Sequence, residues 1–391
     1  MRSIINQQGT MSNNADFLDS AAELAATIDP HLTSPNPRVG CVIVRNGKII
    51  AEGVHEKFGG AHAEANTFRM LQDSNPRNLG FESNLEVYIT LEPCDHFEGK
   101  KTPSCTDLLL RQKPKKIVVG ALDPQFQGKN LERLQKAGIN VEFQKNKKCE
   151  ELNSFFEKYI TQKLPYVTFK MAQSLDGKVV RDQDSYPQGY ESKYISNEFS
   201  RQKVHEMRAQ YSAVLTTTKT ILADDPLLNC RINPPSLAKR ELEGDLNPPD
   251  SHKRESFPLF PFGFAQGRQR GRKTSDPQII VLGKKEDIPP SAKIFSIPHR
   301  KIHWFDSRDL REIFSQCAEK GIDSILTECG PTLAGELLTQ QLVDQMDLFV
   351  APEIFGRGMA SFSRSIDLSD FSLNRQEHLE GDVWLRFLRK K

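Results

Sequence analysis

Three residues with metal-binding side chains and one carboxylate stand out by their order along the chain. Glu64 lies two positions after His62, and Cys105 lies eleven positions after Cys94. One imidazole and two thiolates can hold Zn²⁺ at three tetrahedral positions and leave the fourth for water. Such a site lowers the pKa of the water to about 7. Glu64 is placed to carry the proton of that water, so these residues predict hydrolytic zinc chemistry of the deaminase type.

Each of these residues also has a more ordinary explanation. A lone cysteine usually belongs to a packed interior, and a structural zinc module would need a fourth good ligand and would leave Glu64 unexplained. His96 is a competing ligand. The general deaminase signature has two residues between its cysteines, whereas Cys94 and Cys105 enclose ten, DHFEGKKTPS.

A second candidate site lies in the C-terminal half. No GxGxxG follows an expected strand there, so a Rossmann nucleotide site is not indicated. Gly330-Pro331-Thr332 stands where an expected strand ending at Glu328 meets a helix through residues 333–338. Unpaired N–H groups at a helix start bind phosphate. The motif alone is of low specificity and favours an ordinary helix cap.

Composition limits the class of protein. The chain has 391 residues, with 53 Lys plus Arg against 51 Asp plus Glu, so its net charge gives no broad attraction to nucleic acid or anionic membranes. It has no apolar run of about 18 residues, and its start lacks the apolar region of a secretory signal. Seven cysteines in such a chain suit a metal or catalytic role better than a disulfide framework. We expect a cytoplasmic enzyme that acts on a small molecule and assembles as a homo-oligomer, with no nucleic-acid or membrane partner.

The elements around the zinc residues are those of an α/β layered domain. Apolar spacing predicts a helix over 16–28, and Asn46-Gly47 predicts a hairpin between strands. The expected strands are 39–44, 48–54, 85–91, 116–122 and 140–143, with helices after residues 62, 103 and 128.

A helix over 148–162 closes this first domain, and we place the boundary near residue 163. The expected domains are 12–163 and 164–391. Strands are predicted in the second at 166–172, 212–216, 278–282, 301–305, 324–328 and 345–351. The stretch 233–276 is rich in Pro, Gly, Arg and Lys and is interpreted as a surface insertion.

Longer motifs carry a family resemblance. In order along the chain are PNPRVGCVIV (35–44), EGVH (52–55), HAE (62–64), TLEPCDH (90–96) and KTPSC (101–105). The second half has FKMAQSLDGK (169–178), VHEMRAQYSAVLTT (204–217), TILADDPLLNCR (220–231) and TECGPTLAGELL (327–338). Together they resemble the bifunctional riboflavin-biosynthesis deaminase/reductases. The resemblance implies two α/β domains, the N-terminal one cytidine-deaminase-like and the C-terminal one dihydrofolate-reductase-like.

The resemblance also implies two consecutive reactions on a pyrimidine ribose phosphate. The first is zinc-dependent hydrolysis of the 2-amino group of 2,5-diamino-6-ribosylamino-4(3H)-pyrimidinone 5′-phosphate. The second is NADPH-dependent reduction of the ribosyl group to ribityl. Two other hypotheses stay open: a deaminase whose C-terminal half is a binding or assembly module, and a deaminase that acts on nucleic-acid bases.

Site residues are carried over from the family position by position. In the deaminase half, His62, Cys94 and Cys105 correspond to zinc ligands and Glu64 to the catalytic residue. The substrate positions there correspond to Asn36, His55, His96 and Lys101. The loop between Cys94 and Cys105 is two residues longer than usual in the family, so Lys100 is an alternative to Lys101.

In the reductase half, the substrate positions correspond to Ser192, Arg208, Leu228, Arg231 and Glu328. The cofactor positions correspond to Ala172, Tyr194, Thr220, Asp224, Gly330, Pro331, Thr332, Leu333, Ala334, Gly335 and Glu336. Lys170 and Asp176 are further candidates for positioning cofactor or substrate, although Asp176-Gly177 is equally typical of a plain turn. Without the family, Arg208 would be interpreted as part of a surface ion pair.

Overall fold

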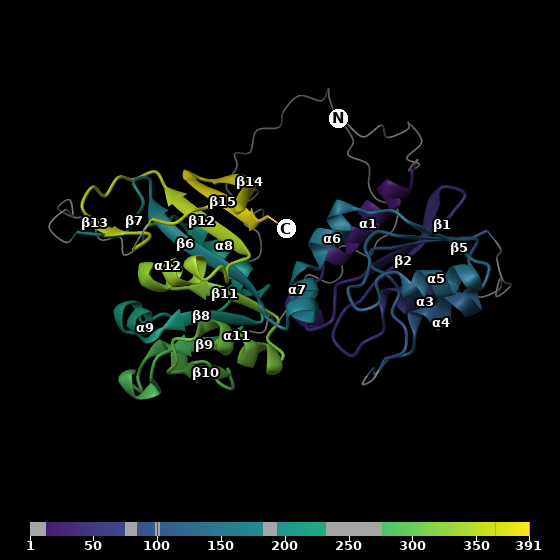
Figure 1. The fold of residues 1–391 in the computed structure, drawn as a ribbon. Helices are drawn as coiled ribbons and strands as arrows, with labels where there is room; N and C mark the ends of the chain where they lie inside the picture. The colour runs from purple at the N-terminus through teal and green to yellow at the C-terminus, as the bar shows by residue number, and fades with distance from the viewer. Residues whose placement is uncertain are drawn as a thin grey trace, which may run out of the picture.

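The computed structural model describes residues 13–74, 84–97, 100, 102–182, 194–231, 276–363 and 365–390. Two sheets, each with its own helices, lie on opposite sides of the molecule (Figure 1). The expected boundary near residue 163 falls between helix α7 (Ser154–Gln162) and strand β6 (Tyr166–Ser174). The expected surface insertion lies outside the described residues except for Asp276.

The N-terminal sheet has five strands in the order β2-β1-β3-β4-β5. They are β1 (Gly40–Arg45), β2 (Lys48–Val54), β3 (Glu86–Ile89), β4 (Lys116–Val119) and β5 (Asn140–Phe143). β1 is antiparallel to β2 and β3, whereas β3, β4 and β5 are parallel. The expected hairpin is confirmed: Asn46 and Gly47 have φ values of 50° and 72°, as a type I′ turn requires.

Helices cover both faces of this sheet because β1 alternates its apolar side chains. Cys41 and Ile43 pack in a core with α3 (Ala63–Ser74), α4 (Cys105–Gln112) and α5 (Lys129–Lys136). Val42 and Val44 pack in a second core with α1 (Asn14–Ala26), α6 (Lys147–Leu152) and α7. The short helix α2 (Pro30–Thr33) precedes β1. A three-layer α/β/α domain results.

The single helix expected over 148–162 was wrong, because α6 and α7 are separate helices that meet at Asn153. Asn153 has a φ of −121°, outside the helical range. Its side chain accepts a hydrogen bond from Arg38 N at 2.8 Å and donates one to Arg38 O at 2.9 Å. Asparagine favours such bonds to other backbone groups over a helix interior.

The C-terminal sheet has eight strands in the order β10-β9-β8-β11-β6-β12-β15-β14. Besides β6, they are β8 (Ala213–Thr217), β9 (Gln278–Leu282), β10 (Ile302–Phe305), β11 (Ser324–Glu328), β12 (Gln345–Ala351), β14 (Phe371–Leu379) and β15 (Asp382–Arg389). The strands from β10 to β12 are parallel, and β15 and β14 add an antiparallel hairpin. A small separate sheet joins β7 (Lys178–Arg181) to β13 (Gly358–Ala360).

Two cores again flank the second sheet. One contains α11 (Leu310–Glu319) and α12 (Pro331–Thr339), and the other contains α8 (Glu198–Arg208) and α9 (Thr218–Asp224). Because β8, β11 and β6 are parallel, their carboxyl ends meet at one edge of the sheet and their amino ends at the other. Across the described ranges we found no helix with the length and hydropathy of a membrane span.

Candidate functional site

The three sequence-predicted metal ligands converge in the structure. His62 immediately precedes α3, Cys94 lies in the segment after β3, and Cys105 begins α4. His62 Nδ1 lies 3.3 Å from Cys94 Sγ and 3.4 Å from Cys105 Sγ. Zinc bonds of about 2.0–2.3 Å in a tetrahedron separate their ligand atoms by about 3.5 Å. The observed donor set therefore fits a zinc ion with three protein ligands.

Residues behind the ligands fix their orientation. Thr102 Oγ1 lies 3.0 Å from His62 Nε2, which leaves Nδ1 of that ring to face the two sulfur atoms. Ser104 caps α4 by accepting a hydrogen bond from Asp107 N at 3.0 Å, and so sets the start of the helix at Cys105. Sequence reasoning missed Thr102, although it belongs to the recognised KTPSC segment. Such partners hold a ligand in its binding geometry.

Glu64 is almost fully buried in the first turn of α3 and lines the same cavity as His62 and Cys94. Burial raises the pKa of its carboxyl group, and the negative charge of Cys94 raises it further. A hydrogen bond from the Cys105 thiol lowers the pKa of Cys94 to about 3, and the same bond raises that of Cys105. Zinc takes cysteine ligands as thiolates, so its binding would release the thiol proton of Cys105.

The cavity has a volume of about 270 Å³ and brings together side chains from several loops. Asn36 Nδ2 lies 3.4 Å from His55 Nε2, and His55 Nδ1 lies 3.0 Å from Ala61 O. Nδ1 of His55 therefore carries the proton, and Nε2 accepts from the Asn36 amide. Burial lowers the pKa of His55, which keeps the ring neutral. Both predicted substrate residues line the same cavity as the metal ligands His62 and Cys94.

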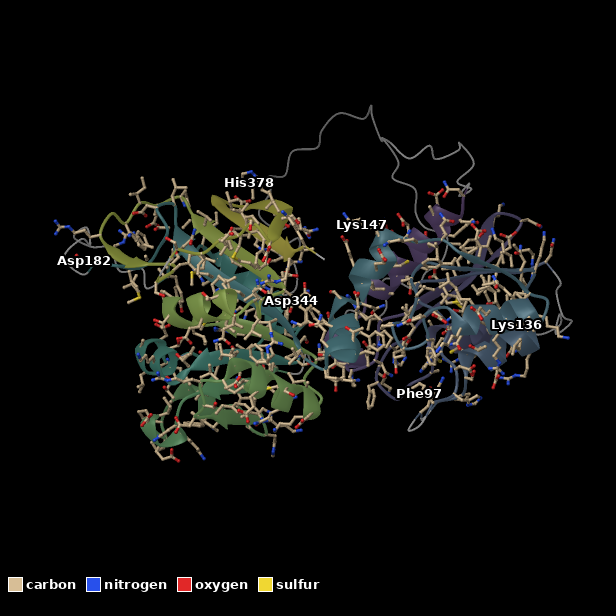
Figure 2. All side chains as sticks on the ribbon, viewed as in Figure 1. Phe97, Lys136, Lys147, Asp182, Asp344 and His378 are labelled. Carbon is tan, nitrogen blue, oxygen red and sulfur yellow. The ribbon has the colours of Figure 1, made fainter. Side chains whose placement is uncertain are left out.

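The long loop between the cysteines places Lys100 in this cavity. Its Nζ donates hydrogen bonds to Cys94 Sγ at 2.7 Å and to Asp95 O at 3.0 Å, and it lies 5.7 Å from the Phe97 ring centre. The exposed Phe97 ring is labelled in Figure 2. Lys101 lies outside the described residues. Of the two candidates, Lys100 is the one whose surroundings the structure describes.

His96 lies apart from the other predicted substrate residues. It is not among the described residues that line the cavity, and 71% of its side chain is exposed. Its Nε2 lies 2.7 Å from Asp107 Oδ2. Arg133 binds Asp95 and Asp107 at 2.6 and 2.7 Å, so a cation already occupies this acidic group. His96 does not belong to the ligand cluster of His62.

Two buried carboxylates that sequence reasoning missed also line the cavity. Glu92 accepts hydrogen bonds from the backbone N–H groups of Asp123, Gly128 and Asn130 at 3.2, 2.8 and 3.0 Å. It thereby holds the segment that follows β4. Burial raises the pKa of Asp123 to about 6. Glu92 lies within the recognised TLEPCDH segment, whereas Asp123-Pro124 is typical of a turn.

In the C-terminal half, Arg208 and Glu328 form a buried ion pair. Arg208 Nε and Nη2 donate to the two Glu328 carboxylate oxygens at 2.5 and 2.9 Å, and only 13% of each side chain is exposed. Lys170 Nζ lies 3.9 Å from Glu328 Oε2. Burial alone would raise the pKa of Glu328, but the charge and hydrogen bonds of Arg208, with the charge of Lys170, lower it to about 2. The surface ion pair expected for Arg208 without the family is thus buried.

The predicted phosphate-binding helix start lies beside this ion pair in sequence. Gly330 is the N-cap of α12, with extended backbone at φ −75° and ψ 172°, and no side chain of the described residues caps it. A Cβ on Gly330 would meet none of the described atoms within 4 Å. Backbone N–H groups at a helix start without a side-chain cap suit the diphosphate of a nicotinamide cofactor. Leu333, Ala334 and Gly335 instead lie in the core, and Pro331, Thr332 and Glu336 lie between core and surface or are exposed.

Other predicted reductase residues have varied surroundings. Ala172 lies on β6 opposite Phe349. Thr220 is in the first turn of α9, where its N–H donates to Thr217 Oγ1 at 3.1 Å, and Asp224 is the last residue of that helix. Leu228 is buried, whereas Arg231 and Tyr194 are exposed. Ser192 lies outside the described residues.

Asp176 holds a turn. Its carboxylate accepts hydrogen bonds from Ser174 Oγ at 2.6 Å, Phe355 N at 3.0 Å and Gly356 N at 2.8 Å. These bonds, led by the one from Ser174, lower its pKa to about 2. The plain-turn alternative accounts for this side chain.

Comparison with known protein families assigns both halves. Residues 11–121 match the cytidine and deoxycytidylate deaminase zinc-binding region, and residues 165–384 match the RibD C-terminal domain. The fold and the site define a bifunctional enzyme that combines a zinc-binding deaminase domain with a dihydrofolate-reductase-like reductase domain.

Relatives match along nearly the whole chain. The riboflavin biosynthesis protein RibD of Escherichia coli K12 is 32% identical over 372 residues, 91% of this chain and 94% of its own. That of Aquifex aeolicus is 33% identical, with 91% and 93% covered. The chain belongs to the RibD family of riboflavin biosynthesis proteins, deaminase/reductases that use zinc and NADPH.

Solved structures of the family have the same fold. Acinetobacter baumannii RibD is similar with a TM-score of 0.75 at 28% identity, covering 97% of this chain and 99% of that one. The deaminase/reductase of Thermotoga maritima gives a TM-score of 0.74 at 29% identity, with 96% and 98% covered. The resemblance predicted from the sequence motifs is confirmed.

Proposed function

We propose that this chain catalyses two consecutive steps on one pyrimidine ribose phosphate. The N-terminal half would replace the 2-amino group of 2,5-diamino-6-ribosylamino-4(3H)-pyrimidinone 5′-phosphate by oxygen. The C-terminal half would then reduce the ribosyl group and give 5-amino-6-ribitylamino-uracil 5′-phosphate. The carrying observation is that Glu64, Asn36 and His55 share one cavity with His62 and Cys94, which form the metal-ligand cluster together with Cys105. The Thermotoga maritima relative is described as a diaminohydroxyphosphoribosylaminopyrimidine deaminase and 5-amino-6-(5-phosphoribosylamino)uracil reductase.

In the deaminase half, His62, Cys94 and Cys105 would hold zinc, which supplies hydroxide at neutral pH. Glu64 takes the proton of the attacking water and passes protons to the ring nitrogen and to the leaving ammonia. The amide of Asn36, oriented by its bond to His55, reads the polar edge of the pyrimidine. The deamination therefore consumes one water molecule and releases one ammonia molecule.

A cationic side chain completes the substrate site. We assign this role to Lys100, because its Nζ lies in the cavity beside Cys94. An ammonium group binds a carbonyl or phosphate oxygen of the substrate by a charge-assisted hydrogen bond. The assignment of Lys101 from the family stays a prediction, and so does a substrate contact of His96.

In the reductase half, bound NADPH supplies the hydride. The backbone N–H groups at the start of α12 would bind its diphosphate. Glu328 ends β11 two residues before Gly330 and lies in register with Lys170 in the middle of β6. Arg208 holds Glu328 in one orientation through two hydrogen bonds. The exposed guanidinium of Arg231 is placed to bind the substrate phosphate.

We also propose that the two domains comprise 12–163 and 164–391, since the last helix of the first sheet ends at Gln162 and the second sheet begins at Tyr166. The expectations of a cytoplasmic location and a homo-oligomer stay predictions. Light scattering of the purified chain checks the oligomeric state.

Incubation of the purified chain with the diamino-pyrimidine phosphate, followed by mass analysis, tests the proposed function. We expect loss of the amino group with or without NADPH, and reduction of the ribosyl group only with NADPH. Deamination without any reduction would instead support a C-terminal binding module. No deamination of this substrate would contradict the proposal.

A further inference from the structure

Helix α7 lies between the two halves of the molecule and contacts both (Figure 1). Phe156 lines the deaminase cavity, whereas the neighbouring Phe155 ring lies 4.9 Å from Tyr166 and 5.1 Å from Tyr211 of the reductase half. Tyr159 Oη donates to Ala318 O at 3.1 Å. The deaminase cavity is therefore built directly against the reductase domain.

A second contact reaches the deaminase loop 34–38, which carries Asn36 into the cavity. Ser34 Oγ lies 3.3 Å from Oγ of Ser212, the residue immediately before β8. Ser212 Oγ in turn donates to Asp323 Oδ1 at 2.6 Å. Because the Ser212 proton is committed to a carboxylate, which only accepts, Ser34 must be the donor to Ser212. A directed chain of hydrogen bonds runs from Ser34 through Ser212 to Asp323.

Asp323, the last acceptor in this series of hydrogen bonds, is buried and has a second hydrogen-bond partner. Its side chain is 5% exposed and also accepts a hydrogen bond from Ser324 Oγ at 2.8 Å. Ser212 N donates to Ser324 Oγ at 3.0 Å, which ties the starts of β8 and β11 together. The Ser212 hydroxyl is thus held in place by the reductase sheet and presented to Ser34.

The loop is held by its own half at the other end. Asn153 binds both backbone groups of Arg38, as described above. Between these two anchors Asn36 lies two residues from Ser34, and its N–H donates to Thr33 O at 2.8 Å. Asn36 and Pro37 line both the deaminase cavity and a small cavity of about 30 Å³ that Asp323 also lines. Fixing Ser34 therefore fixes the backbone that aims Asn36.

We propose that Ser212, supported by Asp323, is a positioning residue of the deaminase that the reductase domain supplies. The inference rests on the proposed function, in which Asn36 contacts the pyrimidine. The proposal gives each of the two strand-end edges of the C-terminal sheet its own role. Glu328, at the carboxyl end of β11, serves the reductase, whereas Ser212 and Asp323, immediately before the amino ends of β8 and β11, hold the deaminase loop. The deaminase site is complete only with the reductase domain folded against it.

Kinetics of Ser212→Ala in the full chain test this proposal. Loss of one positioning hydrogen bond should raise the deaminase KM about two- to ten-fold with little change in kcat. Ser34→Ala should give the same rise, and the double variant should give no more than either alone, because both changes remove the same Ser34–Ser212 hydrogen bond. Ser212→Thr keeps the hydroxyl and should restore the KM. NADPH oxidation with the deaminated intermediate should be unchanged throughout.

Tyr159→Phe is the matched control, because it also removes an interdomain hydrogen bond but none to the loop 34–38. Its deaminase KM should equal that of the unaltered chain. Hydrogen exchange supplies a readout independent of turnover: the amides of Ser34, Asn36 and Arg38 should exchange faster in Ser212→Ala and not in Tyr159→Phe.

An unchanged KM and unchanged exchange in Ser212→Ala would overturn the inference, and so would an equal loss of both activities, which would indicate general damage to the fold. If the unaltered chain does not deaminate the diamino-pyrimidine phosphate, the proposed function fails. The exchange comparison still decides in that case whether Ser212 holds the loop.

Discussion

Arg208 and Glu328 face each other across the reductase half with both guanidinium–carboxylate hydrogen bonds made inside the protein. Arg208 ends α8 and Glu328 ends β11, so the pair joins a helix to the carboxyl edge of the sheet. Lys170 on the adjacent strand β6 adds a second positive charge. The pair therefore contributes to stability as well as to the site.

The Arg208–Glu328 pair predicts a pH-dependent stability. The pKa of Glu328 falls from 4.5 to about 2 on folding, so the unfolded chain binds more protons between these values. The stabilisation is fully present above pH 4.5 and is lost as the pH falls through about 2. It amounts to about 3 kcal/mol as an order of magnitude. Urea unfolding should show that Glu328→Gln costs most at neutral pH and progressively less in acid, and a cost independent of pH would contradict this.

Asn153→Ala should destabilise the N-terminal half. The change leaves the backbone N–H and C=O of Arg38 without their partners in a partly buried position, at a cost of about 2 kcal/mol. Thermal unfolding measures the effect. Thr161→Ala, at an exposed position of α7, is the control and should change stability by less than about 0.5 kcal/mol. Equal effects of the two changes would show that the Asn153 bonds contribute nothing.

Cys105→Ser should remove bound zinc and deamination together while NADPH oxidation with the deaminated intermediate persists. The reason is that Cys105 Sγ lies in the His62 cluster, whereas the reductase residues belong to the other sheet. Metal content of the purified variant and ammonia release are the measurements. Cys149→Ala changes a buried thiol of the same half outside that cluster and should keep its zinc. Retention of zinc by Cys105→Ser would remove Cys105 from the ligand set.

Lys100→Gln should raise the deaminase KM about ten-fold or more, because a charge-assisted hydrogen bond to the substrate is lost. Lys101→Gln is the natural comparison. A larger effect of Lys101→Gln would return the substrate position to the residue expected from the family.

Much of the site was predictable because its residues lie in short segments with strong local signals. HAE, TLEPC and KTPSC gave the zinc ligands and Glu64, and Asn46-Gly47 gave the first hairpin. Other residues gave weaker signals. Asn153 breaks an amphipathic helix only because Arg38, far away in sequence, offers it backbone partners. Strand β14 is exposed and polar along most of its length, so no apolar alternation marked it.

Contacts between the two halves could not be predicted from the sequence. Ser34 and Ser212 are ordinary serines in loops, and their meeting depends on how two separately folded sheets are placed against α7. The same holds for Lys158, which binds Asp344 at 2.5 Å across the halves. Asp344 lies on the side of the C-terminal half that faces α7 (Figure 2). The local pattern of apolar and polar residues does not predict such pairs.

The central claim is that one buried carboxylate, Glu64, carries the protons of deamination while a separate site performs the reduction. Glu64→Gln in the full chain tests it most directly, with ammonia release and NADPH oxidation measured on the same preparation. We predict a fall in deamination of about a hundred- to ten-thousand-fold with zinc retained, and unchanged NADPH oxidation when the deaminated intermediate is supplied. Deamination at the original rate would contradict the account.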